Sequence, residues 1–283
     1  MRIYKSSMVL EQLFKTQWLE RRPWHAFLLG AIYSIIGIIS ARLIFGSNPG
    51  MMTVAFTSML LIPSLNKLLQ DEENVEIREK KLSLKLLFKD HYDIFEIYIY
   101  LFLGIFTVFA FVTLMLPAAS AVHLFGPQLK IIGIVGDAIN SSTVMSILTN
   151  NLLVLVVCLV LSLVYGAGSI LFITWNATVW GVVFAYMIKE TALANSRNPL
   201  LYFFLSFLPF LPHMLTEAVS YFSAAIVGGV VSKAVLREKV GSKKFNHIMT
   251  DAYLLLGISL VVVIIAAIIE VNVYPWMSQW FMF

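Results

Sequence analysis

Hydrophobic residues occur along this chain in runs of about 20, separated by short polar segments. A run of that length is what an α-helix needs to cross the hydrocarbon layer of a membrane. Backbone groups inside lipid must pair with one another, which favours helices as the spanning units. The sequence therefore predicts an all-α protein, a polytopic helical transmembrane bundle. The seven predicted spans are residues 25–45, 51–69, 94–119, 146–165, 169–188, 212–232 and 250–273.

Two stretches between these spans depart from the simple pattern. Residues 199–232 are too long for one straight span, and they contain Pro209 and Pro212. Because proline interrupts helices, we expect a short, partly re-entrant segment at 199–211 before the crossing helix. Residues 120–145 are weakly polar, and we expect them to form a loop.

The polar segments in the first third of the chain predict two further helices. Apolar positions three and four apart within residues 1–24 predict an amphipathic helix on the cytoplasmic membrane surface. Residues 70–93 begin with acidic and end with basic side chains, as suits a helix dipole, and predict a cytoplasmic connecting helix. Residues 25–283 are expected to form a single transmembrane domain.

Composition agrees with a membrane protein. Hydrophobic residues make up 59% of the chain and charged residues 13%, whereas a soluble domain carries about 25% charged residues. The mean hydropathy is +0.85. The single cysteine, Cys158, excludes an intrachain disulfide and a multi-cysteine metal site.

The distribution of charge predicts the orientation. Most of the 20 Lys and Arg residues lie before the first span, in residues 70–93, or in residues 233–249. Seven crossings put all three segments on one side, which the positive-inside rule makes cytoplasmic. The N-terminus is then cytoplasmic and the C-terminus outside, in a multi-pass protein of the plasma membrane. The basic residues suit the anionic headgroups of the lipid bilayer, so we expect no nucleic-acid partner.

Several polar side chains lie inside the predicted spans of the C-terminal half. An ionisable group there costs about 2.5–3.5 kcal/mol on insertion scales, so each needs a partner. The candidate polar intramembrane cluster consists of Asn150, Asn151, Asn176, His213, Glu217 and Glu270.

The strongest element of this cluster is the pair His213 and Glu217. Pro212 suits the first turn of a helix, and residues four apart share a helix face. Such a pair can share a hydrogen bond, relay a proton or supply two metal ligands. A zinc site with catalytic geometry needs three protein ligands, and Glu270 is the third only if the fold brings it close. A structural hydrogen-bonded cluster, a proton or ion pathway and a divalent-metal site thus remain open, and no cofactor is required.

A set of short motifs occurs in a fixed order within residues 140–275. The motifs are Asn150-Asn151, Gly166-Ala167-Gly168, Asn176 with Gly181, Pro212-His213-x-x-x-Glu217, Ala224-Ala225 with Gly228, and Ala267-Ile268-Ile269-Glu270. This set resembles the stage II sporulation protein M-like family of integral membrane proteins, and Asp93-Ile94-Phe95 is similar to its archaeal branch. In that family the histidine is usually followed by glycine, whereas this chain has Met214.

The resemblance implies a function without catalysis. In sporulating bacteria, the family member is a membrane scaffold that holds two cell-wall hydrolases. By that resemblance we expect a non-enzymatic membrane scaffold or assembly factor with membrane or cytoplasmic protein partners still to be identified. The small-residue helix faces are also compatible with a homo-oligomer. The alternatives are a small transporter or channel that uses the intramembrane cluster and, third, an intramembrane metalloenzyme, although no catalytic motif is present.

Overall fold

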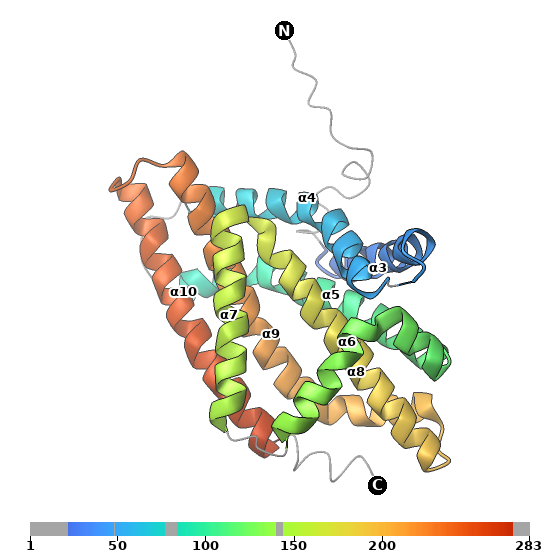
Figure 1. Ribbon diagram of the computed structural model, residues 1–283. Helices are drawn as coiled ribbons and strands as arrows, with labels where there is room; N and C mark the ends of the chain where they lie inside the picture. Colours follow the sequence, from blue (N-terminus) through green and yellow to red (C-terminus); the bar gives the residue numbers. More distant parts are fainter. Residues whose placement is uncertain (1–21, 48, 77–83, 140–143, 274–283) are drawn as a thin grey trace.

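Helices make up all the regular secondary structure that the computed structural model describes, namely residues 22–47, 49–76, 84–139 and 144–273 (Figure 1). The long helices are α3 (His25–Ile44), α4 (Gly50–Glu76), α5 (Leu84–Met115), α6 (Ala118–Ile139), α7 (Val144–Tyr165), α8 (Ile170–Ala194), α9 (Pro199–Arg237) and α10 (Lys243–Ile268). A 3₁₀ turn, η1 (Ala167–Ser169), links α7 to α8, and a π-helical turn, η2 (Ile269–Val273), extends α10.

The prediction of seven spans is confirmed. Seven of the described helices are long and apolar enough to cross a membrane, and α6 is the long helix left out. The predicted amphipathic helix at 1–24 lies almost wholly outside the described residues. Of the predicted connecting helix at 70–93, residues 70–76 continue α4 and residues 84–93 belong to α5, while 77–83 lie outside the described residues.

The helix ends alternate between two sides of the bundle. On one side, the backbone N–H of Ala167 donates to Asn66 Oδ1 at 3.2 Å, and Lys233 lies beside Gly166. These contacts bring together the C-terminal parts of α4, α7 and α9. On the other side, Lys189 near the end of α8 donates to the carbonyl of Leu116 just after α5. The C-terminal ends of α4, α7 and α9 thus lie on one side, and those of α5 and α8 lie on the other.

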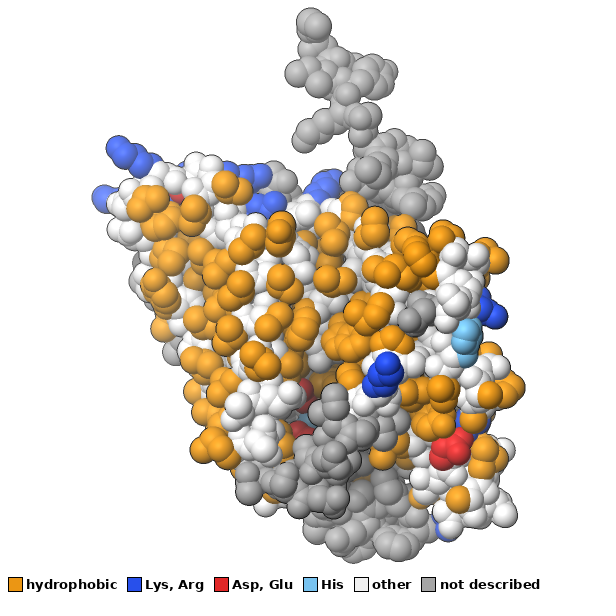
Figure 2. Space-filling view, in the orientation of Figure 1, with side chains coloured by type: hydrophobic (Ala, Val, Ile, Leu, Met, Phe, Trp, Pro, Cys, Tyr) orange, Lys and Arg blue, Asp and Glu red, His pale blue; other side chains and the backbone are white. Residues whose placement is uncertain are grey.

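We call the first side the basic end. It carries the turn between α9 and α10, where five cationic side chains lie close together in sequence, and Figure 2 shows Lys and Arg gathered at this edge of the molecule. These residues are Lys233, Arg237, Lys239, Lys243 and Lys244.

The predicted loop at 120–145 is wrong, because most of it belongs to α6. The backbone of Phe125 is non-helical (φ −122°, ψ 27°), and Figure 1 shows the two arms of α6 meeting at an angle. Pro127 lacks an N–H and its ring crowds the preceding turn, which explains the kink. Since α5 ends and α7 begins on the side opposite the basic end, α6 leaves and returns on that side without crossing.

The predicted break within 199–232 is also wrong. Helix α9 is continuous over 39 residues with Pro209 and Pro212 inside it, and it changes direction along its length (Figure 1). Its first turn is well specified, because Asn198 caps the N–H groups of Leu200 and Leu201. Each proline removes one helical hydrogen bond and so bends the helix. In a transmembrane helix the neighbouring helices satisfy the freed backbone groups, and the helix therefore continues past the proline. The segment at 199–211 is the first part of α9.

Close helix contacts depend on glycines. A Cβ atom on Gly104 of α5 would lie 2.2 Å from the carbonyl oxygen of Phe27, and one on Gly30 of α3 would lie 2.5 Å from that of Leu101. The two helices thus touch backbone to backbone. Gly228 of α9 likewise approaches α7 closely, since a Cβ atom there would lie 2.6 Å from the carbonyl oxygen of Leu159. Small residues are the usual means of tight helix packing in membranes.

We expect Gly104→Ala to destabilise the protein by about 1–3 kcal/mol, the usual cost of overpacking. The reason is that the added methyl group would meet a backbone oxygen, which cannot rotate away. The check is the thermal unfolding midpoint of the purified protein in detergent. Gly257→Ala on α10 is the matched control, because a Cβ there meets nothing within 4 Å. Equal midpoints for both variants would contradict the proposed close contact.

Candidate functional site

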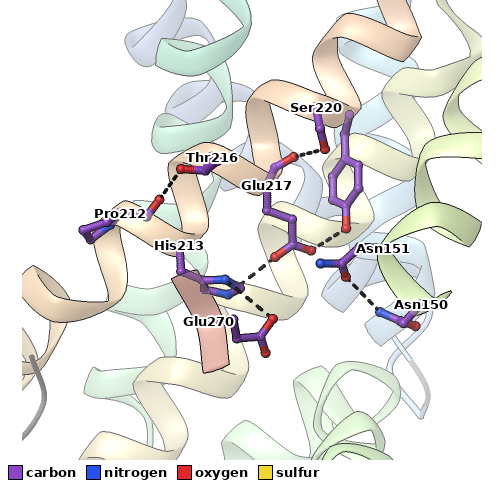
Figure 3. A network of polar contacts seen from close by, with 9 residues as sticks. Asn150, Asn151, Pro212, His213, Thr216, Glu217, Ser220 and Glu270 are labelled. Atoms are coloured by element: carbon purple, nitrogen blue, oxygen red, sulfur yellow. Dashed lines mark hydrogen bonds and ion pairs between the residues drawn. The ribbon is translucent and has the colours of Figure 1, made fainter. Parts of the chain in front are cut away.

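Three ionisable side chains from two helices meet inside the bundle (Figure 3). His213 Nε2 lies 3.4 Å from Glu217 Oε2, and His213 Nδ1 lies 3.6 Å from Glu270 Oε2. One ligand atom from each side chain can be chosen so that all lie within 4.8 Å of one another. The structure thus brings in Glu270, the third potential ligand, which the sequence could not place.

The backbone explains why these side chains converge. His213 and Glu217 are four residues apart in α9 and share its buried face, with exposed fractions of 7% and 5%. Glu270 comes from η2, where the helix widens from α to π. Such π-helical turns occur often at functional sites. The side chain of Glu270 is one-third exposed, so it forms the outer edge of the site.

Neighbouring groups fix the orientation of the buried pair. The Tyr221 hydroxyl donates to Glu217 Oε1, which leaves Oε2 directed at His213. The rings of Trp180 and Phe210 flank the imidazole, with centroids at 6.0 Å and 5.3 Å. These contacts restrict both side chains to the arrangement seen in Figure 3.

Helix α7 contributes an amide to the same region. Asn151 is 3% exposed, and its Oδ1 accepts a hydrogen bond from Asn150 Nδ2 at 3.4 Å. Its own Nδ2 is buried without a hydrogen-bond partner among the described residues. Figure 3 shows the Asn151 amide directed toward Glu217. Five of the six candidate residues therefore lie close together, on α7, α9 and η2.

Asn176, the sixth candidate residue, satisfies its side chain locally. Its Nδ2 donates to the carbonyl of Phe172 one turn earlier in α8, at 2.8 Å. In the described part of the chain, no hydrogen bond links it to the other five residues.

The cluster has too few hydrogen-bond donors for the acceptor oxygens that surround His213. A neutral imidazole has one N–H, yet carboxylate oxygens face both nitrogens of His213. The separations of 3.4 and 3.6 Å exceed the 2.7–3.2 Å of a good N–H···O bond, and Nδ1 has no hydrogen-bond partner among the described residues. No Lys or Arg among the described residues pairs with either glutamate. An added proton or cation would meet this deficit.

Sequence reasoning missed Tyr221, Trp180 and Phe210. Tyr221 was open to prediction, since it lies four residues after Glu217 on the same face of α9. The two aromatic rings carried no such signal, because their contact with the imidazole depends on how α8 and α9 pack.

Comparison with known protein families gives one match. The sequence model of the family described as stage II sporulation protein M matches residues 94–275, which hold α6 to α10, nearly all of the span part of α5, and every residue of the cluster. Comparison with curated proteins and with solved structures gives no match. The match covers well over half of the chain, so the protein belongs to the stage II sporulation protein M family, whose members are integral membrane proteins.

Proposed function

We propose that this multi-pass membrane protein is a non-enzymatic scaffold or assembly factor that holds another membrane protein through the outward face of α10. Membership of the stage II sporulation protein M family supports this proposal, because the family resemblance implies a membrane scaffold. The observation that carries the proposal is an open glycine on that face.

Helix α10, together with α7, is the least covered of the seven described span helices. Only 28% of the span window in α10 is buried, against 72% in α9. Tyr253, Val261 and Ile268 are about half or more exposed, and they follow the helical spacing of one stripe. Gly257 belongs to the same stripe, and a Cβ there would meet no atom within 4 Å.

Lipid chains cover an apolar helix face as well as a protein does, so exposure alone does not favour a partner. An exposed glycine does favour a protein partner, because it allows the backbone of another helix to approach closely. Contact with lipid chains is not improved by a glycine at that position. In the other span helices, Gly30, Gly104, Gly181 and Gly228 each lie against the backbone of a neighbouring helix, whereas Gly126 of the non-crossing α6 is open, as Gly257 is. We therefore place the transmembrane helix of a partner protein at Gly257.

The same proposal sets the protein in the plasma membrane with the basic end in the cytoplasm. The cationic turn between α9 and α10 supports this orientation, because basic residues concentrate on the cytoplasmic side. The candidate site then opens toward the outside, since η2 lies at the far end of α10 from Lys243.

A photo-crosslinking residue at Val261 tests the scaffold in the native membrane. We expect one defined protein adduct, identified by mass spectrometry, because Val261 lies one helical turn from Gly257. Adding Gly257→Leu should abolish the adduct without lowering the amount of folded protein, since the site is open.

The matched control is the same crosslinker at Ile39 of α3, which is 53% exposed compared with 56% for Val261. Ile39 should give lipid adducts alone. A Val261 adduct with a second copy of this chain would show that α10 forms a homo-oligomer interface and would contradict the scaffold proposal. Lipid adducts alone at both positions would exclude the proposed docking face.

A second candidate function, proton or cation transport, is favoured by the gradient of exposure within the site. The side chain of Glu270 is 33% exposed, while those of His213 and Glu217 are 9% and 7% exposed. Figure 2 shows acidic atoms at the base of a small hollow in the hydrophobic face. Intramembrane carboxylates and histidines commonly line proton pathways.

Proteoliposomes containing a pH-sensitive dye test this candidate. If the protein conducts protons, Glu217→Gln should abolish the flux, because a glutamine side chain cannot take up and release a proton as a carboxylate does. His247→Ala is the control, since it removes a histidine near the basic end of α10 and leaves the site intact. A wild-type flux that equals that of empty liposomes, or is unchanged by Glu217→Gln, would eliminate transport.

A further inference from the structure

We propose that His213, Glu217 and Glu270 bind a divalent metal ion, zinc, at the end of the bundle opposite the basic end. This site would exist whether or not α10 docks a partner. Its residues offer one imidazole nitrogen and two carboxylates, a donor set that zinc accepts, with a fourth position for water.

The spacing of the side chains fits a metal better than a hydrogen-bonded cluster. Ligands of a tetrahedral zinc ion at 2.0–2.1 Å lie about 3.3 Å from one another. The 3.4 Å separation between His213 Nε2 and Glu217 Oε2 is close to that value and too long for a good hydrogen bond. Glu270 faces the other ring nitrogen, Nδ1, at 3.6 Å, and one ligand atom from each of the three side chains can be chosen so that all lie within 4.8 Å of one another. A modest inward movement of Glu270, which is the most exposed of the three, would complete the set.

Charge balance favours a divalent ion over a single proton. Two ionised carboxylates inside a membrane protein are costly without compensation. No Lys or Arg side chain in the described ranges offsets them. A Zn²⁺ ion bound by Glu217, Glu270 and a neutral His213 makes the whole site electrically neutral.

The surroundings resemble the supporting shell of a metal site. Ligating carboxylates in proteins are held by a hydrogen bond from a neighbour, which orients the free oxygen. The Tyr221 hydroxyl does this at Glu217 Oε1. The buried Asn151 Nδ2, without a partner among the described residues and directed at the cluster, is an independent sign that something is bound there. A metal-bound water is a suitable acceptor for it.

The chain contains a matched control. His247 and Asp251 of α10 form a second pair four residues apart, with His247 Nε2 3.4 Å from Asp251 Oδ2. Its spacing equals that of His213 and Glu217, but the one group of three potential ligands among the described residues is the proposed site. A true metal site should therefore depend on Glu217 and be indifferent to His247.

The test is elemental mass spectrometry on the full chain in detergent, loaded with zinc chloride and freed of unbound ions. We expect about one zinc ion per wild-type chain, a loss of nearly all of it in Glu217→Gln and Glu270→Gln, and full retention in His247→Ala. Zinc below about a tenth of an ion per wild-type chain would overturn the proposal. So would equal zinc in all four proteins, or a different metal lost in the same variants.

Tyr221→Phe tests the site without removing a ligand. Loss of a supporting hydrogen bond typically weakens metal affinity by about tenfold or more. Competition with a chromophoric chelator should show that loss, while saturating zinc still gives the wild-type stoichiometry. An unchanged affinity would contradict the role of Tyr221 in orienting Glu217.

Thermal unfolding gives a readout that depends on the native fold of each protein. A ligand that binds the folded state raises its stability, so EDTA should lower the unfolding midpoint of the wild type and of His247→Ala. The midpoints of Glu217→Gln and Glu270→Gln should not respond to EDTA. A wild-type midpoint insensitive to both EDTA and added zinc would count against the site.

Discussion

Every polar group that enters the lipid layer must find its partner inside the protein, and this constraint governs most of the structure. Backbone groups meet it by forming long helices. Hydroxyl groups on those helices meet it by donating to a carbonyl one turn back, as Thr57 and Thr113 do at 2.8 Å. Side chains that cannot be satisfied within their own helix must meet others, and α7, α9 and η2 converge where such side chains occur.

The same constraint explains how far the fold could be predicted. The length of a hydrophobic run fixes a crossing helix almost by itself, so all seven spans were found. One of the two errors, in α9, arose at prolines, and the other, at α6, arose because residues 120–145 are weakly polar. The sequence shows that Pro127, Pro209 and Pro212 each remove a backbone donor, but whether neighbouring helices then preserve the helix depends on packing. At α6 the weak polarity of residues 120–145 concealed a helix that does not cross.

The candidate site, too, could be predicted from the sequence only in part. Spacing along α9 is sufficient to pair His213 with Glu217. Glu270 is more than 50 positions away, and only the packing of α10 on α9 brings it to 3.6 Å from the same imidazole. Asn176 looked equivalent in sequence, yet a carbonyl of its own helix satisfies it. An amide has this local solution, whereas a buried carboxylate has no donor to find along its own backbone.

Helix α9 connects the two sides of the membrane as one continuous element. It carries His213 and Glu217 on its buried face, and about 20 residues later it ends at the basic turn. At 1.5 Å per residue, that distance is a lever arm of about 30 Å. A tilt of about one degree at the proline bend would displace the basic end by about 0.5 Å. The geometry of a few atoms on one side of the membrane is thus mechanically tied to the position of a charged surface on the other.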